Sequence, residues 1–195
     1  MARSLWEAET YVNLRLAETT PRPEGLVSPT PAPKVGENMT EGPDGWTWHS
    51  PIGDIAIPYV SEKTTVQVGA PFGLGRSRLI DAAEWIHVAH LYGERAIADM
   101  MEYAGDEHPK GDFQDQERRR SISLGFELAV DATLQAMAFL PDGEDVVPDG
   151  EIWSTFGAGV KDANPDVVTR AKMEEELEYW RGVNEDFIGF YEETP

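Results

Sequence analysis

The sequence contains no cysteine among its 195 residues, which excludes disulfides, zinc–thiolate sites and a cysteine nucleophile. It also lacks an apolar run of about 18 residues, the length needed to cross a bilayer, so we expect no membrane contact. The first ten residues, MARSLWEAET, do not have the basic-then-apolar layout of a Sec signal. We therefore expect a cytoplasmic or virion protein that is not secreted by a Sec signal.

Basic residues are scarce in this chain. Lysine and arginine together number 16 against 36 aspartate and glutamate residues, which gives a formal net charge of −20. Binding to nucleic acid depends on a positively charged surface that neutralises phosphates. The charge balance therefore argues against direct nucleic-acid binding, and we expect the partners to be proteins.

The acidity itself has three interpretations. A protein adapted to high salt carries many acidic residues, because screening reduces their mutual repulsion. A protein that docks on a basic partner needs an acidic surface to match it. A bias in composition would give the same counts without a functional reason. Halophilic adaptation is the simplest of the three, and the sequence does not separate them.

Apolar residues are plentiful enough for a folded core. They make up 41% of the chain and include six tryptophans, which excludes wholesale disorder. Strand patterns are followed by helical patterns along the chain, which predicts an α+β fold that is mainly α. The expected segments are an N-terminal helix (1–20), a proline-rich extended arm (21–44), a small β-meander with a glycine-rich turn (45–76) and a helical bundle (77–195).

The first two segments predict a helix carried on an arm. Ser4 and Glu7 have capping-box spacing at the start of a short helix over residues 4–18. The prolines that follow indicate an extended connection, which serves either as a solvated linker or as an arm lying across a neighbouring subunit. A helix this short must pack on something to be stable. The helix residues expected to bind a partner are Leu5, Trp6 and Tyr11.

Residues 45–70 alternate with the period of β-strands. Bulky and β-branched residues at every second position predict three short antiparallel strands, and such a meander needs a helix to cover its apolar face. The expected strands lie at 46–49, 55–59 and 65–68, with turns at 50–53 and 61–63.

Three later segments have the three- and four-residue apolar spacing of long amphipathic helices. The predicted helices span residues 77–104, 112–140 and 165–192, with Ser77, Asp112 and Asn164 as their N-terminal caps. The glycine- and proline-rich stretch between the second and third helices, residues 141–163, is expected to be a loop. Together the helices predict a bundle.

The first long helix carries a candidate metal site. Its residues, at helical steps of three, three and four, are Glu84, His87, His90 and Glu94. Glu-x-x-His is the spacing of di-metal sites in bundles, which also need a second such pair from other helices. Glu127 and Asp131 could supply oxygens, but the other two long helices have no histidine. A structural role is the simpler interpretation, and we expect no cofactor.

Motifs of other enzymes are incomplete. The glycine-rich stretch at 66–78 includes two arginines but lacks the Walker lysine and a surrounding βαβ unit, so a tight turn is expected there. No Gly-x-Ser-x-Gly elbow is present, and the spacing does not select any of the four histidines as a general base. We therefore expect no catalytic residue and no enzymatic activity.

Two charged patches favour contact between subunits. A basic triplet interrupts the acidic chain at Arg118, Arg119 and Arg120. It forms either a salt-bridged helix surface with nearby acids or a docking patch for an acidic surface of another copy. The acidic residues expected to meet it, on the last long helix, are Glu174, Glu175 and Glu178.

The functional hypothesis is a non-enzymatic assembly subunit that binds neighbouring subunits in a homo-oligomer or hetero-assembly, for example in a virus or phage particle or its connector. Two alternatives remain open. An acidic immunity protein or inhibitor would use the charge of −20 to attract a basic toxin or nuclease. A metal-binding enzyme built on the helical bundle would use Glu84 and His87.

Overall fold

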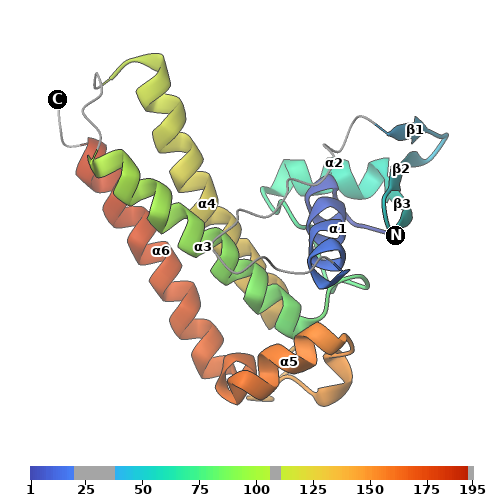
Figure 1. Ribbon diagram of the computed structural model, residues 1–195. Helices are drawn as coiled ribbons and strands as arrows, with labels where there is room; N and C mark the ends of the chain where they lie inside the picture. The colour runs from blue at the N-terminus through green and yellow to red at the C-terminus, as the bar shows by residue number, and fades with distance from the viewer. Residues whose placement is uncertain (20–37, 106–110, 193–195) are drawn as a thin grey trace. The chain divides into compact units, whose positions relative to one another are not determined.

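The computed structural model describes residues 1–19, 38–105 and 111–192 (Figure 1). The chain divides into two compact units, Met1–Asp81 and Ala82–Pro195. It is mainly helical with a small antiparallel sheet, which confirms the predicted α+β, mainly α fold class. Most of the predicted proline-rich arm falls on residues 20–37 and lies outside the described residues. Among the helices of the described ranges, none is both long and apolar enough to span a membrane.

The described residues of the Met1–Asp81 unit form two helices and a three-stranded sheet. Its elements are α1 (Leu5–Thr19), β1 (Met39–Glu41), β2 (Gly45–Ser50), β3 (Gly53–Pro58) and α2 (Tyr59–Val68). The strands are antiparallel in the order β1-β2-β3. The predicted turn at 50–53 is confirmed, because the Ser50 hydroxyl donates to the Gly53 carbonyl oxygen at 2.6 Å.

One of the three predicted strands is wrong. Residues 65–68 belong to α2, and the predicted turn at 61–63 lies inside the same helix. The third strand of the sheet is β1, from the end of the stretch predicted as an arm. Alternating valines favour a strand only where one side of the alternation is buried. Here Val66 and Val68 are exposed, and Gly69 closes the helix in a left-handed conformation with φ of 66°.

Helix α1 shares one hydrophobic core with the sheet. Ala8 and Val12 of α1 are buried against Trp48, Ile55 and Ile57 of the strands. These strand residues alternate along β2 and β3, so they lie on one side of the sheet. The sequence predicts that α1 must pack on something, and the surface it covers is the apolar side of the sheet in its own unit.

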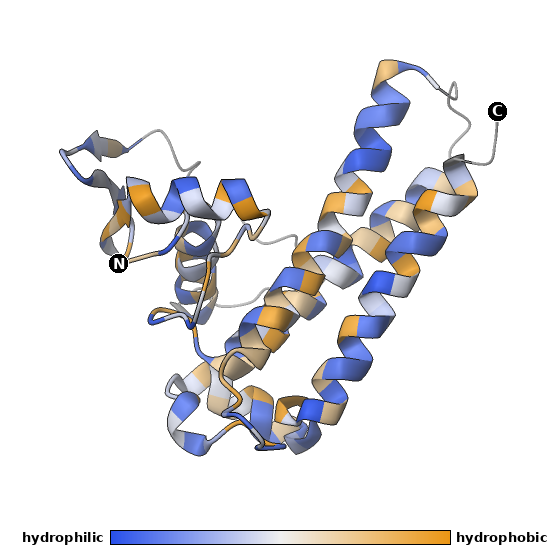
Figure 2. Cartoon of the chain, turned by 180° about the vertical axis from the view of Figure 1, so that it is seen from behind, coloured by the Kyte–Doolittle hydropathy of each residue, from blue (hydrophilic) through white to orange (hydrophobic). Residues whose placement is uncertain are grey.

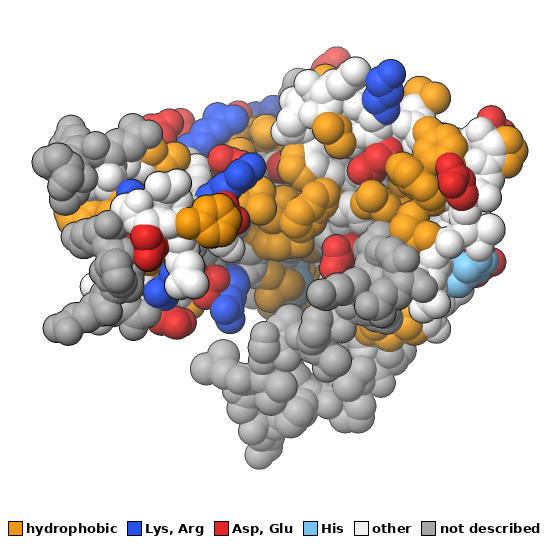
Figure 3. All heavy atoms as spheres, turned by 90° about the horizontal axis from the view of Figure 1, so that it is seen from above, with side chains coloured by type: hydrophobic (Ala, Val, Ile, Leu, Met, Phe, Trp, Pro, Cys, Tyr) orange, Lys and Arg blue, Asp and Glu red, His pale blue; other side chains and the backbone are white. Residues whose placement is uncertain are grey.

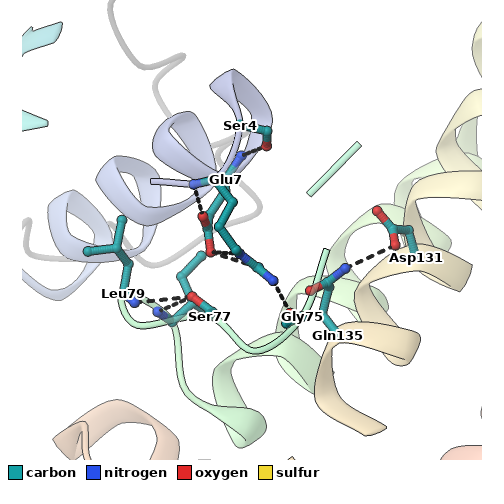
Figure 4. A network of polar contacts seen from close by, with 9 residues as sticks. Ser4, Glu7, Gly75, Ser77, Leu79, Asp131 and Gln135 are labelled. Atoms are coloured by element: carbon teal, nitrogen blue, oxygen red, sulfur yellow. Dashed lines mark hydrogen bonds and ion pairs between the residues drawn. The ribbon is translucent and has the colours of Figure 1, made fainter. Parts of the chain in front are cut away.

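Polar contacts hold the start of α1 in this unit (Figure 4). The Ser4 hydroxyl accepts from the backbone N–H of Glu7 at 3.0 Å, as the capping spacing predicts. The carboxylate of Glu7 binds the guanidinium of Arg3 at 2.7 Å, and that guanidinium also donates to the carbonyl oxygen of Gly75. The backbone N–H of Leu5 donates to the carboxylate of Glu62 in α2 at 2.8 Å. Local capping contacts and two other parts of the unit, Gly75 and α2, therefore fix this helix terminus.

The described residues of the Ala82–Pro195 unit form a bundle of three long helices closed by shorter ones. Its elements are α3 (Ala82–Gly105), α4 (Phe113–Met137), η1 (Asp149–Glu151), α5 (Thr155–Ala163), η2 (Pro165–Val168) and α6 (Arg170–Glu192). The apolar stripes of the long helices meet in a core that includes Phe126, Trp180 and Phe187. Figure 2 shows that the first turns of α4 are hydrophilic.

Several predicted boundaries in this unit are wrong. Helix α3 begins five residues later than expected, because the Ser77 hydroxyl accepts from the N–H groups of Leu79 and Ile80 in a turn. The expected loop at 141–163 contains α5, which Ser154 caps by accepting from the N–H of Gly157 at 2.8 Å. The stretch after Asn164 starts as the 3-10 helix η2, so α6 begins later than expected. The predicted Asp112 cap of α4 is confirmed.

Two glycines allow the long helices to approach closely. A Cβ atom at Gly93 of α3 would lie 2.4 Å from the indole ring of Trp180 in α6. A Cβ atom at Gly125 of α4 would lie 2.9 Å from the Cβ of Ala96 in α3. Both distances are well inside van der Waals contact. Glycine lowers helix propensity at these positions, but it allows the helices to pack closely.

Candidate functional site

The N-terminal residues expected to bind a partner differ in exposure. Leu5 and Tyr11 are partly buried against the core that α1 shares with the sheet. Trp6 is exposed, with a relative accessibility of 37%. Tyr11 also lies under the guanidinium of Arg15, 5.3 Å from the ring centre. Of the three residues, Trp6 is therefore the one whose side chain presents a large apolar surface to solvent.

The candidate metal ligands on α3 point to different neighbours. The His87 ring packs edge-on against Phe156 of α5, with centres 4.7 Å apart. Nε2 of His90 lies 3.1 Å from Oε2 of Glu176 in α6. Glu84 is fully buried, whereas Glu94 is exposed. In residues 1–19, 38–105 and 111–192, no group of three or more histidine, aspartate or glutamate side chains is arranged to hold a metal ion.

His90 belongs to a polar cluster at a small cavity of the bundle. Lys172 and Glu176 of α6 and Thr133 of α4 line the same cavity, which is too small for more than about one water molecule. Nζ of Lys172 lies 3.0 Å from Glu175 and 3.6 Å from Glu176. The two glutamates raise the pKa of Lys172, and the largest cause is the hydrogen bond that the Lys172 ammonium donates to Glu175. The contact between His90 and Glu176 joins α3 to α6.

A second polar cluster lies where α3 ends and α4 begins. The hydroxyl of Tyr103 donates to the buried carboxylate of Asp115 at 2.5 Å, and Arg119 binds the same carboxylate at 2.5 Å. Arg119 also donates to the backbone carbonyl oxygen of Tyr191 in α6 at 3.4 Å. Burial and the hydrogen bond to Asp115 raise the pKa of Tyr103 to about 12. Arg119 of α4 therefore contacts α6 directly and is linked to Tyr103 of α3 through the shared Asp115 carboxylate.

The other two arginines of the triplet face outward. The guanidinium of Arg118 lies 5.5 Å from the ring centre of Tyr103 and 4.0 Å from Oε1 of Glu102 in α3, and its side chain remains partly exposed. Arg120 is exposed and forms no ion pair with another described residue. The sequence leaves two roles open for the triplet, a salt-bridged helix surface or a docking patch. The structure gives Arg119 an internal contact and leaves Arg118 and Arg120 at the surface.

Large apolar side chains accompany these arginines at the same end of the bundle. Phe113, Met101 and Phe190 have relative accessibilities of 76%, 68% and 66%. Figure 3 shows basic, acidic and apolar side chains interleaved at this end of the bundle, on the left of the view. We define the bundle-end surface as Met101, Phe113, Arg118, Arg120 and Phe190. Exposed apolar groups with charged neighbours are typical of protein–protein contacts.

The predicted acidic residues lie on the solvent side of α6. Glu174, Glu175 and Glu178 are all exposed, and we define them as the acidic row. Glu175 binds Lys172, whereas Glu174 and Glu178 have no ion pair within the part of the chain that the structure describes. The acidic row therefore presents negative charge that the described residues of its own bundle do not neutralise.

The acidic row and the bundle-end surface are far apart on the same bundle. Arg119, next to the outward arginines, contacts Tyr191 near the end of α6. Glu178 precedes Tyr191 by more than three helical turns, which is about 20 Å along the helix at 1.5 Å per residue. Opposite charges at this separation are screened from each other at physiological salt. The two surfaces cannot pair within one bundle.

A third polar cluster, which the sequence pattern does not predict, lies on the sheet of the Met1–Asp81 unit. Nδ1 of His49 in β2 lies 2.8 Å from Oδ1 of Asp54 in β3, and Nε2 of His49 lies 2.8 Å from Oγ1 of Thr40 in β1. His49 pairs directly with Asp54 in the register of β2 and β3. The sequence pattern does not predict β1, so it gives no reason to expect Thr40 beside His49.

Comparison with protein-family models, curated proteins and solved structures finds no match for this chain. Its function therefore has to be argued from its own residues.

Proposed function

We propose that this protein is an assembly subunit that binds a second copy of itself. The acidic row of one copy meets the bundle-end surface of the next. The observation that carries the proposal is the separation of the acidic row from exposed Arg120 and half-exposed Arg118, which lie too far from it to pair within one bundle. A contact between copies neutralises both surfaces.

The apolar members of the bundle-end surface supply the other requirement of an interface. Charged contacts at a surface contribute little affinity alone, so a stable interface also needs buried aromatic or aliphatic side chains. Phe113 and Phe190 provide exposed rings beside the arginines. Tyr179, next to the acidic row on α6, is half exposed and gives the opposing surface an aromatic group.

The contact joins different surfaces of the two copies, so it is heterologous. A heterologous contact builds a closed ring if its rotation closes and a filament if it does not. Both outcomes suit a subunit of a larger protein structure, such as a virus or phage particle or connector. A protein that remains a monomer would instead favour the acidic inhibitor hypothesis, in which the acidic row serves a basic partner.

Charge reversal tests this proposal. Arg118→Glu with Arg120→Glu should lower the mass in solution, measured by light scattering, and so should Glu174→Lys with Glu178→Lys. All four changes in one chain should restore the mass of the wild type, because the charges are then exchanged. Arg95→Glu is the matched control, since this exposed arginine pairs locally with Asp99 at 2.8 Å and with no other acid of the described ranges, so the mass should stay unchanged.

Two outcomes would overturn the proposal. If the wild type has the mass of one chain at all concentrations tested, the copies do not associate. If both double variants keep the mass of an assembled wild type, the association uses other surfaces. Denaturation curves of each variant establish that lost mass does not reflect an unfolded bundle.

A further inference from the structure

Three hydrogen-bonded side chains on the sheet, Thr40, His49 and Asp54, are arranged like a nucleophile, a base and an orienting carboxylate. Asp54 accepts a hydrogen bond as a carboxylate, so Nδ1 of His49 carries the hydrogen in their 2.8 Å contact. Nε2 of the neutral ring is then an acceptor, and the hydroxyl of Thr40 donates to it at 2.8 Å. This arrangement holds one tautomer of the imidazole and directs its lone pair at a hydroxyl.

We propose that Thr40 is the nucleophile of an acyl-transfer site whose substrates are small carboxylic esters. The three side chains come from three neighbouring strands, so the backbone ladder fixes their spacing. His49 and Asp54 have side-chain accessibilities of 48% and 66%, and Thr40 is also exposed. A small ester can therefore reach the hydroxyl from solvent. The site goes beyond the assembly function, and neither proposal depends on the other.

Backbone donors lie beside the nucleophile. The N–H of Gly42 bonds the carbonyl of Gly45, and the N–H of His49 bonds the carbonyl of Asn38. Hydrogen-bonded pairs alternate along an antiparallel ladder, so the N–H groups of Met39 and Glu41 point away from β2. In the described sheet β1 is the outer strand. These two N–H groups flank Thr40 and have no hydrogen-bond partner among the described residues. They lie about 6.7 Å apart along the strand, so one of them at a time can donate to the carbonyl oxygen of an ester as negative charge develops on it.

The glutamate next to the nucleophile is held on the other side of the sheet. Successive side chains of a strand point to opposite sides, so Glu41 points away from the side that carries Thr40. The hydroxyl of Tyr59 donates to the Glu41 carboxylate at 3.0 Å and fixes it there. Its negative charge is therefore kept from the position where an oxyanion would form.

The proposed reaction has two balanced steps. The Oγ1 of Thr40 forms a bond to the carbonyl carbon of the ester while its proton moves to Nε2 of His49. The bond from that carbon to the leaving alcohol breaks, and the leaving oxygen takes the proton from His49. Water then attacks the acyl-threonine in the same way, giving its proton to His49, and Thr40 leaves with that proton as a free hydroxyl.

The experiment uses the full-length protein and p-nitrophenyl acetate, with the acetylated residues identified by mass spectrometry. Thr47 is an internal control, because it pairs directly with Thr40 in the register of β1 and β2 and lies on the same side of the sheet. General-base catalysis typically accelerates a reaction by about a hundredfold or more. Even a partial effect of this kind should make acetylation of Thr40 at least tenfold greater than acetylation of Thr47. His49→Gln should reduce acetylation of Thr40 to the level of Thr47, and Thr40→Ser should keep it.

Two further variants make the result decisive. Thr40→Val keeps the β-branched shape and removes only the hydroxyl, so it should abolish the label while the sheet stays folded. Asp54→Ala should weaken labelling because the imidazole is no longer oriented. Equal labelling of Thr40 and Thr47 overturns the proposal. Unchanged labelling in His49→Gln, or release of p-nitrophenol with acetyl found on His49 and none on Thr40, overturns it as well.

Discussion

At the scale of single residues, Tyr103 shows how burial and a neighbouring carboxylate change the acidity of a side chain. It is buried, donates to Asp115 and lies under the guanidinium of Arg118. Its hydroxyl must stay protonated to donate to a carboxylate, which is why its pKa rises to about 12 from an ordinary value of 10. The contact between α3 and α4 therefore depends on the neutral tyrosine.

This pKa gives a prediction for alkaline pH. The folded state holds the Tyr103 proton more tightly than the unfolded state, so its stabilising contribution is complete below pH 10 and falls between pH 10 and about pH 12. Tyr103→Phe should cost about 1–2 kcal/mol at neutral pH through the lost hydrogen bond. Urea denaturation of both proteins from pH 8 to 12 should show their stabilities converging as the pH rises, and parallel curves would contradict this role.

Two glycine substitutions should act in opposite directions. Gly93→Ala should destabilise the protein by about 1–2 kcal/mol, because overpacking against the Trp180 ring outweighs the gain in helix propensity. Gly182→Ala on α6 meets no atom within 4 Å and should stabilise it by up to about 1 kcal/mol. Urea denaturation of both variants measures the pair, and a stabilising Gly93→Ala would show that Trp180 does not lie on this glycine.

Residue spacing alone could not reveal the Thr40–His49–Asp54 chain. The hydroxyl and the carboxylate lie nine and five positions from the histidine, and only the strand register brings them together. The candidate metal ligands illustrate the opposite case. His87 and His90 share a helix and a suitable spacing, but the next helices supply a phenylalanine and a glutamate instead of converging ligands.

At the scale of helices and strands, elements with strong end signals were the most predictable. Asp112 caps α4 as expected, and its contact to the N–H of Asp115 is 2.8 Å. Helix α5 was missed because Gly157 and Gly159 lower helix propensity, while burial of Gly157 in the tertiary structure decides its conformation. Helix α2 was missed because its valines resemble a strand. Which side is buried depends on the rest of the fold.

The helical conformation of residues 59–68 can be tested by substituting Val66. Val66 is exposed in a helix, so Val66→Ala should stabilise the protein by about 0.5 kcal/mol through helix propensity. Thr47→Ala in β2 is the matched comparison and should destabilise it, because alanine is disfavoured in strands. Thermal or urea denaturation measures both. A loss of stability in Val66→Ala would argue for the strand that the sequence predicts.

At the scale of the whole molecule, charge has two opposite effects. The net charge of −20 makes each folded chain repel itself, and salt should relieve that repulsion and raise the melting temperature. The proposed contact between copies is an attraction between the acidic row and the bundle-end surface, which salt should weaken.

The two effects can be separated by raising NaCl from about 0.05 to 1 M. The melting temperature of the variant with Arg118→Glu and Arg120→Glu, followed by circular dichroism, should rise with salt. The light-scattering mass of the wild type should fall over the same range. A wild-type mass that grows with salt would show that the association is apolar and that the charges oppose it.

The mass of the wild type at low salt tests the central claim most directly. One chain weighs 21.7 kDa. We expect light scattering to give a multiple of this value, which falls when either charged surface is reversed and returns when both are reversed together. A wild type that stays at the mass of one chain would contradict the proposed assembly.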